Sequence, residues 1–181
     1  MITKDDNDLV YEVIRGNVSS FEILVERYQK MIFNMVLRMV GDTETAKDLT
    51  QDVFVKTFEK MGSFNFKYRF FSWIYRIAVN ETIDWIKQTP RMDGLEYAQN
   101  LHAEEDHSDG KERRIVMLDM ALQKLSPDYR ILLLLKYYNG LSYEEVAEVN
   151  GLSLEKVRSR LFIAREQLRK ILLQKGFFEN E

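Results

Sequence analysis

The sequence predicts an all-α protein made of two small helical domains joined by an acidic flexible linker. Apolar residues recur three and four positions apart through most of the 181 residues, which is the spacing of amphipathic helices. Only two prolines, Pro90 and Pro127, interrupt that pattern, and an acidic stretch without periodicity separates its two parts. We assign residues 1–90 to the first domain, 91–112 to the linker and 113–181 to the second domain.

Four helices are predicted in the N-terminal domain. Ser19 and Glu22 stand in the order of a capping box, which predicts Ser19 as an N-cap. The helix that follows is expected to end at Gly41, and another helix begins after Asp42. The last helix cannot extend to Pro90, because the residue before a proline disfavours helical dihedral angles. The predicted helices cover about residues 8–15, 20–40, 43–61 and 70–88.

The stretch from Gly62 to Lys87 is rich in aromatic rings and cations. Its rings are Phe64, Phe66, Tyr68, Phe70, Phe71, Trp73, Tyr75 and Trp85, and its cations are Lys67, Arg69, Arg76 and Lys87. One helix cannot bury so many rings on a single face. Rings offer stacking surfaces to unpaired bases and cations contact phosphates, so this composition is typical of single-strand binding. The alternative is an ordinary core helix preceded by an aromatic loop.

The C-terminal domain follows the acidic stretch, which carries Asp93, Glu96, Glu104, Glu105, Asp106 and Asp109. Ser126 and Pro127 are a typical start for a helix, with serine as N-cap and proline in the first position. By periodicity alone, the apolar run at 131–135 fits a buried strand or a buried helix. The helix start before it and the stop at Asn139–Gly140 after it favour a helix.

The next segment, 143–169, has the pattern of a helix-turn-helix. Ser142 and Glu145 form a second predicted capping box, Gly151 suits the left-handed residue of a tight turn, and Ser153 can cap the helix that follows. In a helix-turn-helix the second helix enters the major groove of DNA. The alternative is a plain pair of antiparallel helices.

Helical geometry divides this second helix into a buried stripe and an outward face. The predicted stripe is Val157, Leu161, Ala164 and Leu168, whereas Arg158, Ser159, Phe162 and Arg169 point outward between Lys156 and Lys170. From residue 153 to residue 176 there are seven basic residues against two acidic ones. Basic side chains supply salt-dependent phosphate binding, an arginine can read a base edge, and an outward phenylalanine can contact a thymine methyl group. Arg158 is the best candidate for base reading.

Composition excludes several other classes. The chain has no cysteine, which excludes disulfides, a thiolate metal site and a cysteine nucleophile. No apolar run approaches the ~18 residues of a membrane span, and the first residues lack the apolar region of a signal peptide. We therefore expect a cytoplasmic protein without direct membrane insertion. The net charge of −3 conceals a strong asymmetry between the acidic linker and the basic C-terminal helix.

Three stretches together resemble the extracytoplasmic-function (ECF) group of bacterial RNA polymerase sigma factors, in the sigma-70 family. They are DTETAKDLTQDVFVKTF at 42–58, FFSWIYRIAVNETIDWIK at 70–87 and GLSYEEVAEVNGLSLEKVRSRLFIAREQLR at 140–169. The resemblance covers nearly the whole chain and depends on all three stretches in this order. It implies a promoter-specificity subunit that binds core RNA polymerase, recognises the −35 and −10 promoter elements and promotes DNA melting. It also implies that the linker runs toward the RNA exit path, with carboxylates that imitate nucleic acid.

The resemblance further implies three sets of site residues. Those expected to contact core polymerase are Asp48, Gln51, Asp52 and Phe54. Those expected to hold the single-stranded −10 element are Asn65, Phe66, Lys67, Tyr68 and Arg69 in the loop, with Trp73, Arg76 and Asn80 on the helix. Those expected to contact the −35 element are Ser153, Lys156, Arg158, Ser159 and Phe162. The implied partners are core RNA polymerase, promoter DNA and an anti-sigma factor, without a small-molecule substrate, a cofactor or a metal.

Two alternatives remain open at the level of sequence. A conventional helix-turn-helix regulator would bind duplex DNA without polymerase, its N-terminal half serving as a sensor or dimerisation domain, but it gives no reason for the aromatic loop. A metal enzyme could use His102 and His107, yet five residues of separation place them on different sides of a helix. No phosphate-binding glycine loop or nucleophile–base pair is present, so we expect no enzymatic activity and no catalytic residue.

Overall fold

The computed structural model describes residues 4–89 and 110–174, and within these ranges it contains helices and turns but no strand. The all-α prediction is therefore confirmed for the described part of the chain. The N-terminal helices are α1 (Asp6–Ile14), α2 (Ser19–Val40), α3 (Thr43–Glu59) and α4 (Phe70–Gln88), with a 3-10 turn η1 (Met61–Ser63). The C-terminal helices are α6 (Gly110–Gln123), α7 (Pro127–Leu133), α8 (Tyr143–Asn150) and α9 (Leu154–Gln174), with a π-helical turn η2 (Leu134–Tyr138).

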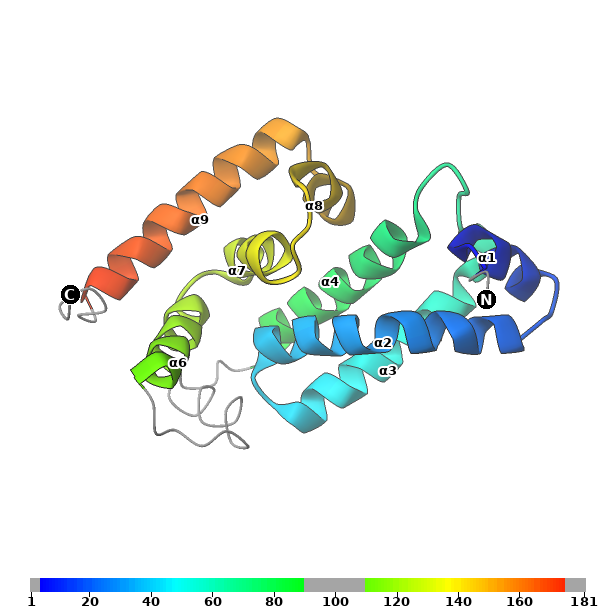
Figure 1. Ribbon diagram of the computed structural model, residues 1–181, viewed down its shortest axis with the longest axis horizontal. Helices are drawn as coiled ribbons and strands as arrows, with labels where there is room; N and C mark the ends of the chain where they lie inside the picture. Colours follow the sequence, from blue (N-terminus) through cyan, green and yellow to red (C-terminus); the bar gives the residue numbers. More distant parts are fainter. Residues whose placement is uncertain (1–3, 90–109, 175–181) are drawn as a thin grey trace.

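The N-terminal domain is a bundle in which α2, α3 and α4 pack together and α1 packs against α2 (Figure 1). Its core includes Leu24 and Ile32 of α2, Val53 of α3 and Ile74 of α4, all fully buried. These residues recur at helical spacing, so each helix turns one apolar stripe inward. Burial of such stripes, more than helix propensity, holds the bundle together.

One predicted helix start is wrong. Ser19 is not an N-cap: α2 begins at Ser19, and the Phe21 amide donates to the Val18 carbonyl at 2.9 Å. The neighbouring hydroxyl of Ser20 donates to the carboxylate of Glu12 in α1. The start predicted after Asp42 is confirmed, because its carboxylate accepts the Thr45 amide at 2.7 Å.

In the C-terminal domain the helix-turn-helix pattern is confirmed. Both bonds of the second capping box are present: Ser142 Oγ accepts the Glu145 amide at 3.1 Å, and the Glu145 carboxylate accepts the Ser142 amide at 2.9 Å. Gly151 has φ of 63°, a left-handed conformation that glycine adopts without strain, and it joins α8 to α9. The apolar run at 131–135 is helical, as predicted: it begins in α7 and its last two residues lie in η2.

The two domains pack against each other. Helix α4 lies beside α7 and α8, and the C-terminal end of α2 contacts α7 (Figure 1). At that end, the buried Arg130 donates through Nη1 to the Met39 carbonyl at 2.9 Å. Arg38 of α2 pairs with Asp119 of α6 at 3.0 Å. The predicted linker lies mostly outside the described residues, as do His102 and His107, and α6 begins at Gly110 within the segment assigned to the linker.

Candidate nucleic-acid interface

The loop before α4 is a compact turn that displays two aromatic rings. The Asn65 side-chain oxygen accepts the Lys67 amide at 3.0 Å, and the Asn65 carbonyl accepts the Tyr68 amide at 3.0 Å. An Asn that bonds to its own backbone two residues on stabilises a turn locally. Phe66 is 45% exposed and Tyr68 is 57% exposed. The loop thus presents both rings to solvent, while the amide oxygen of Asn65 serves the turn.

A buried aromatic cluster supports this loop. The Phe64 ring lies 5.1 Å from Phe66, 5.8 Å from Phe70 and 5.3 Å from Trp73, measured between ring centroids. Phe64, Phe70 and Tyr75 are buried, whereas Trp73 is half-buried at the edge of the cluster. The interpretation as core therefore holds for the buried rings of this stretch, and the single-strand site stays a prediction for the exposed rings. Some rings are core, and they hold the exposed ones in place.

The candidate residues on α4 share one face. Trp73, Arg76, Asn80 and Lys87 fall within about 60° of one another around the helix axis, since successive residues turn by about 100°. Arg69 precedes the helix directly at the same end as the loop. Asn80 is exposed, one turn beyond Arg76. The structure thus brings the cations and the amide of α4 to one face, and the Phe66 ring lies near it because Phe66 and Trp73 both pack against Phe64.

Part of this face is in contact with the helix-turn-helix. Arg69 Nη1 lies 2.7 Å from Glu145 Oε1. Arg76 donates through Nη2 to the Glu148 carbonyl and through Nε to the Val149 carbonyl at 3.4 Å. Hydrogen bonds from the Ser142 backbone amide and hydroxyl, together with the Arg69 guanidinium, lower the pKa of the Glu145 carboxyl, while partial burial opposes them.

Helix α9 carries the second set of candidates. Val157, Leu161 and Ala164 are buried as predicted, whereas Leu168 is half-buried. Ser159 is exposed and Phe162 is 60% exposed, so most of this ring faces solvent. Ser153 Oγ accepts the Lys156 amide at 3.3 Å and so caps the helix.

Tyr143 is a residue that sequence reasoning missed. The Arg158 guanidinium lies 6.0 Å from the centroid of the Tyr143 ring, at the outer limit of a cation–π contact. Tyr143 is the first residue of α8, and Arg158 lies in the first turns of α9. The contact depends on how the two helices cross, so no short-range pattern in the sequence indicates it.

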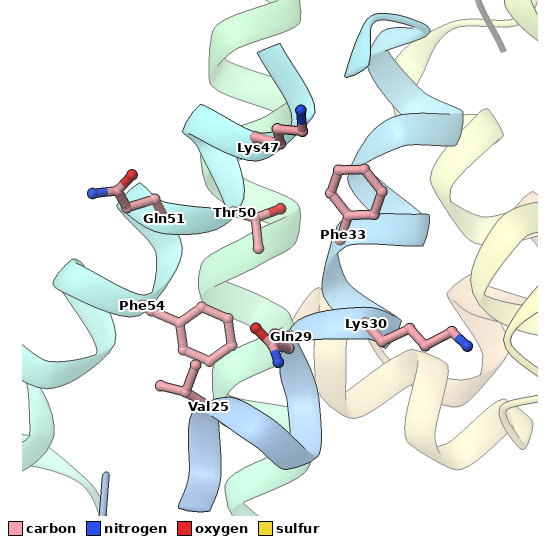
Figure 2. A pocket seen from close by; sticks show the side chains of 8 residues that line it. All are labelled: Val25, Gln29, Lys30, Phe33, Lys47, Thr50, Gln51 and Phe54. Atoms are coloured by element: carbon pink, nitrogen blue, oxygen red, sulfur yellow. The ribbon is translucent and has the colours of Figure 1, made fainter. Parts of the chain in front are cut away.

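A groove between α2 and α3 forms the third candidate surface (Figure 2). Its volume is about 510 Å³, and its lining is Val25, Gln29, Lys30, Phe33, Lys47, Thr50, Gln51 and Phe54. Figure 2 shows Phe33 and Phe54 on facing helices with their rings toward the groove. Gln51 and Phe54 line it, and Phe54 is only 8% exposed, so it contributes to the floor. Asp48 and Asp52 are exposed on α3 but do not line the groove.

Comparison with known families identifies both domains. Residues 24–91 match the model of sigma-70 region 2, and residues 115–168 match that of sigma-70 region 4. RNA polymerase sigma-H factor of Pseudomonas aeruginosa is 33% identical, over 95% of this chain and 96% of that protein. ECF RNA polymerase sigma-E factor of Escherichia coli is 32% identical, over 90% of this chain and 92% of that protein.

The chain belongs to the ECF sigma factors of the sigma-70 family. A solved structure of CnrH in complex with the cytosolic domain of CnrY has a TM-score of 0.67 to this ECF sigma factor and 27% identity, covering 92% of this chain and 96% of that one. A co-crystal structure of the sigma factor RpoE with the anti-sigma factor NepR from Bartonella quintana shares the fold, with a TM-score of 0.64 and 23% identity, over 86% of this chain and 98% of that one.

Family membership decides between the sigma factor and the conventional regulator. Sigma factors act in transcription initiation with RNA polymerase, so the conventional regulator is set aside. The family consists of transcription factors rather than enzymes. Among residues 4–89 and 110–174 no cluster of three potential metal ligands is present, and no helix of those ranges is long and apolar enough to cross a bilayer.

Proposed function

We propose that this ECF sigma factor directs core RNA polymerase to promoters by reading the −35 element with α9 and by holding the separated −10 strand on α4 and the loop before it. The observation that carries the proposal is the face of α4 formed by Trp73, Arg76 and Asn80, with the exposed rings of Phe66 and Tyr68 in the loop directly before that helix. Exposed rings beside cations on a rigid support are what a single-strand site requires. A polar amide on the same face can read the edge of an unpaired base.

The energetics assign the polymerase a part in melting. Extruding a base from a duplex costs a few kcal/mol, and stacking it on an aromatic ring returns about 1–3 kcal/mol. One captured base therefore roughly balances its own cost. The chain alone should open DNA poorly, and contacts with the polymerase must supply the remaining free energy.

The −35 contact is assigned to the exposed side of α9. Arg158 and Phe162 lie on that side, in the N-terminal half of α9. Recognition helices contact bases with their N-terminal residues. Lys156 and Ser159 are also exposed on α9 and can contact phosphates. Ser153 adds the cap that fixes the start of the helix.

Core polymerase binding is assigned to the groove between α2 and α3. An apolar floor with a polar rim is the anatomy of a protein–protein interface. Gln51 and Phe54 line the groove, and the exposed Asp48 and Asp52 stand beside it on α3. An anti-sigma protein is a further proposed partner, supported by the second protein, the cytosolic domain of CnrY, in the similar solved structure of CnrH. Because bacterial RNA polymerase works in the cytoplasm, we place the chain there, acting without enzymatic activity of its own.

Reconstituted transcription tests this function. Core polymerase with and without the purified chain is given genomic DNA of the source organism, and transcript 5′ ends are sequenced. A defined set of start sites, sharing two upstream elements, should appear only when the chain is present. If the chain adds no start sites, the proposed function is wrong.

Asn80→Ala tests the base-reading site. We expect the variant to bind core polymerase normally and to form fewer open complexes. The lost amide removes about 1–3 kcal/mol of interaction with the unpaired base that the open complex exposes. Permanganate reactivity of unpaired thymines measures melting, and co-purification with core polymerase is the control. Unchanged melting would contradict the assignment of Asn80.

A further inference from the structure

We propose that Asp6 and Tyr28, a carboxylate and a hydroxyl that join α1 to α2, position the loop before α4 for strand binding. The inference rests on the proposed function and deepens it, by naming positioning residues for the same site. Tyr28 is buried, with 6% of its surface exposed, and Asp6 is half-buried. Both act on the site through aromatic rings, which lead from Tyr28 to Arg69 and to Phe66.

One carboxylate holds two side chains of α2. The Tyr28 hydroxyl donates to Asp6 Oδ2, and Arg27 Nη1 donates to Asp6 Oδ1. Arg27 also donates through Nη2 to the Lys4 carbonyl at 3.0 Å. A hydrogen bond to an ionised acceptor is stronger than one between neutral groups. Burial, and then the hydrogen bond to Asp6, raise the pKa of the Tyr28 hydroxyl, so the proton that it donates stays in place.

Helix α1 is a fixed support at the end of the bundle where the loop before α4 lies (Figure 1). It packs against α2 and against η1, the turn that directly precedes the loop. Leu9 and Val10 of α1 are fully buried. Near the C-terminal end of α1, the Glu12 carboxylate accepts the Ser20 hydroxyl. Because Asp6 is the first residue of α1, hydrogen bonds hold this helix to α2 at both of its ends.

The first series of rings leads from Tyr28 to Arg69. The Tyr28 and Phe71 ring centroids are 6.2 Å apart, and the Arg69 guanidinium lies 5.8 Å from the Phe71 centroid. That second distance is within the range of a cation–π contact. A displaced Tyr28 ring would therefore displace the ring against which Arg69 lies.

The second series of rings leads from Tyr28 to Phe66. The Tyr28 and Phe70 centroids are 5.7 Å apart, those of Phe70 and Phe64 are 5.8 Å apart, and those of Phe64 and Phe66 are 5.1 Å apart. All three pairs meet edge to face, a favourable geometry for aromatic rings. Tyr28, Phe70 and Phe64 are buried, whereas Phe66 is 45% exposed. Interiors packed this closely transmit displacement, so the series connects the buried hydroxyl to a ring offered to DNA.

Promoter melting by polymerase holoenzyme that carries Tyr28→Phe tests the proposal. The substitution keeps the ring in the core and removes only the hydroxyl that donates to Asp6. Permanganate reactivity of unpaired thymines should fall by about two- to ten-fold, the range that corresponds to the net loss of one hydrogen bond. The affinity for core polymerase should not change. All variants are compared at a temperature at which circular dichroism shows them folded.

Tyr11→Phe is the matched control for this experiment. It removes the hydroxyl of another tyrosine, which lies on α1 and is 53% exposed. We expect its melting to equal that of the unaltered chain. Equal losses of melting for Tyr11→Phe and Tyr28→Phe would overturn the proposal, as would unchanged melting for Tyr28→Phe.

Two variants of Asp6 provide a rescue experiment. Asp6→Asn keeps a side-chain oxygen that can accept from the Tyr28 hydroxyl, whereas Asp6→Ala leaves that hydroxyl without its acceptor. Holoenzyme with Asp6→Asn should therefore retain more open complexes than holoenzyme with Asp6→Ala. If both variants lose melting equally, the hydrogen bond to Tyr28 does not position the loop and the proposal is wrong.

Fluorescence of Trp73 reports directly on the rings. The chain contains two tryptophans, so Trp85→Phe leaves Trp73 as the single reporter. The Trp73 ring centroid lies 5.3 Å from that of Phe64 and 5.8 Å from that of Phe70, both members of the second series. In the Trp85→Phe background, Tyr28→Phe should shift the emission to longer wavelength, because a loosened cluster admits water. Unchanged emission would overturn the proposal, since the rings would then not transmit the change.

Phe66→Ala and Arg69→Gln separate this proposal from the proposed function. Each variant removes one of the side chains that the rings are proposed to position. If either variant reduces melting while Tyr28→Phe does not, the positioning role alone is refuted. If neither variant reduces melting, the strand-binding function of the loop is refuted instead.

Discussion

Helices α4 and α9 carry the same kinds of side chain, but those side chains differ in what they contact. On α9, Ser159 and Phe162 face solvent, and the Arg158 guanidinium lies 6.0 Å from the centroid of the Tyr143 ring. Arg69, directly before α4, pairs with a carboxylate of the other domain, and Arg76, on α4, donates to a backbone carbonyl of that domain. The comparison teaches that a cationic face suited to nucleic acid is equally suited to a helix end and a carboxylate. Which ligand it holds depends on competition.

The largest expected effect tests whether the outward side chains of α9 contribute to the stability of the fold. Leu161→Ala removes a fully buried side chain and should lower the free energy of unfolding by about 2–5 kcal/mol. Phe162→Ala, at the next residue, removes an exposed ring and should change stability by less than about 0.5 kcal/mol while weakening duplex binding. Urea unfolding followed by circular dichroism measures the first quantity. Equal destabilisation by both variants would show that Phe162 has a packing role.

A smaller effect sharpens what α9 reads. Arg158→Ala should weaken binding of the polymerase holoenzyme to its promoters by about 1–3 kcal/mol and relax sequence choice in the upstream element. Competition between promoter variants, measured at fixed salt, gives both numbers. Equal losses on every sequence would instead identify Arg158 as a phosphate contact.

The smallest effect concerns the pH dependence of the α4–α8 contact. The pKa of Glu145 is lowered in the folded chain, first by the Ser142 amide and also by Arg69, from an ordinary value of 4.5. The hydrogen bonds from Ser142 stabilise the cap of α8, and only the part of the lowering that comes from Arg69 stabilises the contact between the domains. That part is present above the unfolded pKa of Glu145 and is lost as the pH falls through its folded pKa. Energy transfer between dyes placed on the two domains by Lys60→Cys and Glu155→Cys should therefore decrease below about pH 4.5. The free energy of the contact should fall by the amount typical of an exposed ion pair, about 0.2–1 kcal/mol.

Glu145→Gln is the control for that titration, since it removes the group that titrates. Other carboxylates also take up protons in this range, including Asp42, whose pKa is lowered by hydrogen bonds from Thr45. Only the difference between the two chains reports on Glu145. Identical acid profiles would show that Glu145 does not govern the contact.

Local patterns predicted most of the helices correctly. The start after Asp42, the capping box of Ser142 and Glu145 and the turn at Gly151 depend on neighbours within a few residues, and all are present. The prediction for Ser19 was wrong because of a tertiary contact nearby, in which Ser20 donates to Glu12 of α1. A capping pattern cannot indicate a hydrogen bond between the neighbouring Ser20 and a second helix.

The sequence indicates which types of residue the candidate sites contain, but it does not indicate which of those side chains are exposed. Phe64 and Phe66 look alike in the sequence, yet one is buried and the other is 45% exposed. Asn65 reads as a base contact, but its side-chain oxygen holds the turn. Packing against α4 decides the first pair, and a local hydrogen bond decides the role of Asn65.

The order of residues alone determined that the chain is helical, that its second half is a helix-turn-helix and that it belongs among the sigma factors. Helical spacing, caps and family motifs are properties of short segments. They do not depend on how those segments pack against one another. Only the tertiary structure decided that Arg76 meets the end of α8 and that Asp119 meets Arg38. Those pairs are 72 and 81 residues apart in the sequence, and contacts at such separation form only when whole domains pack.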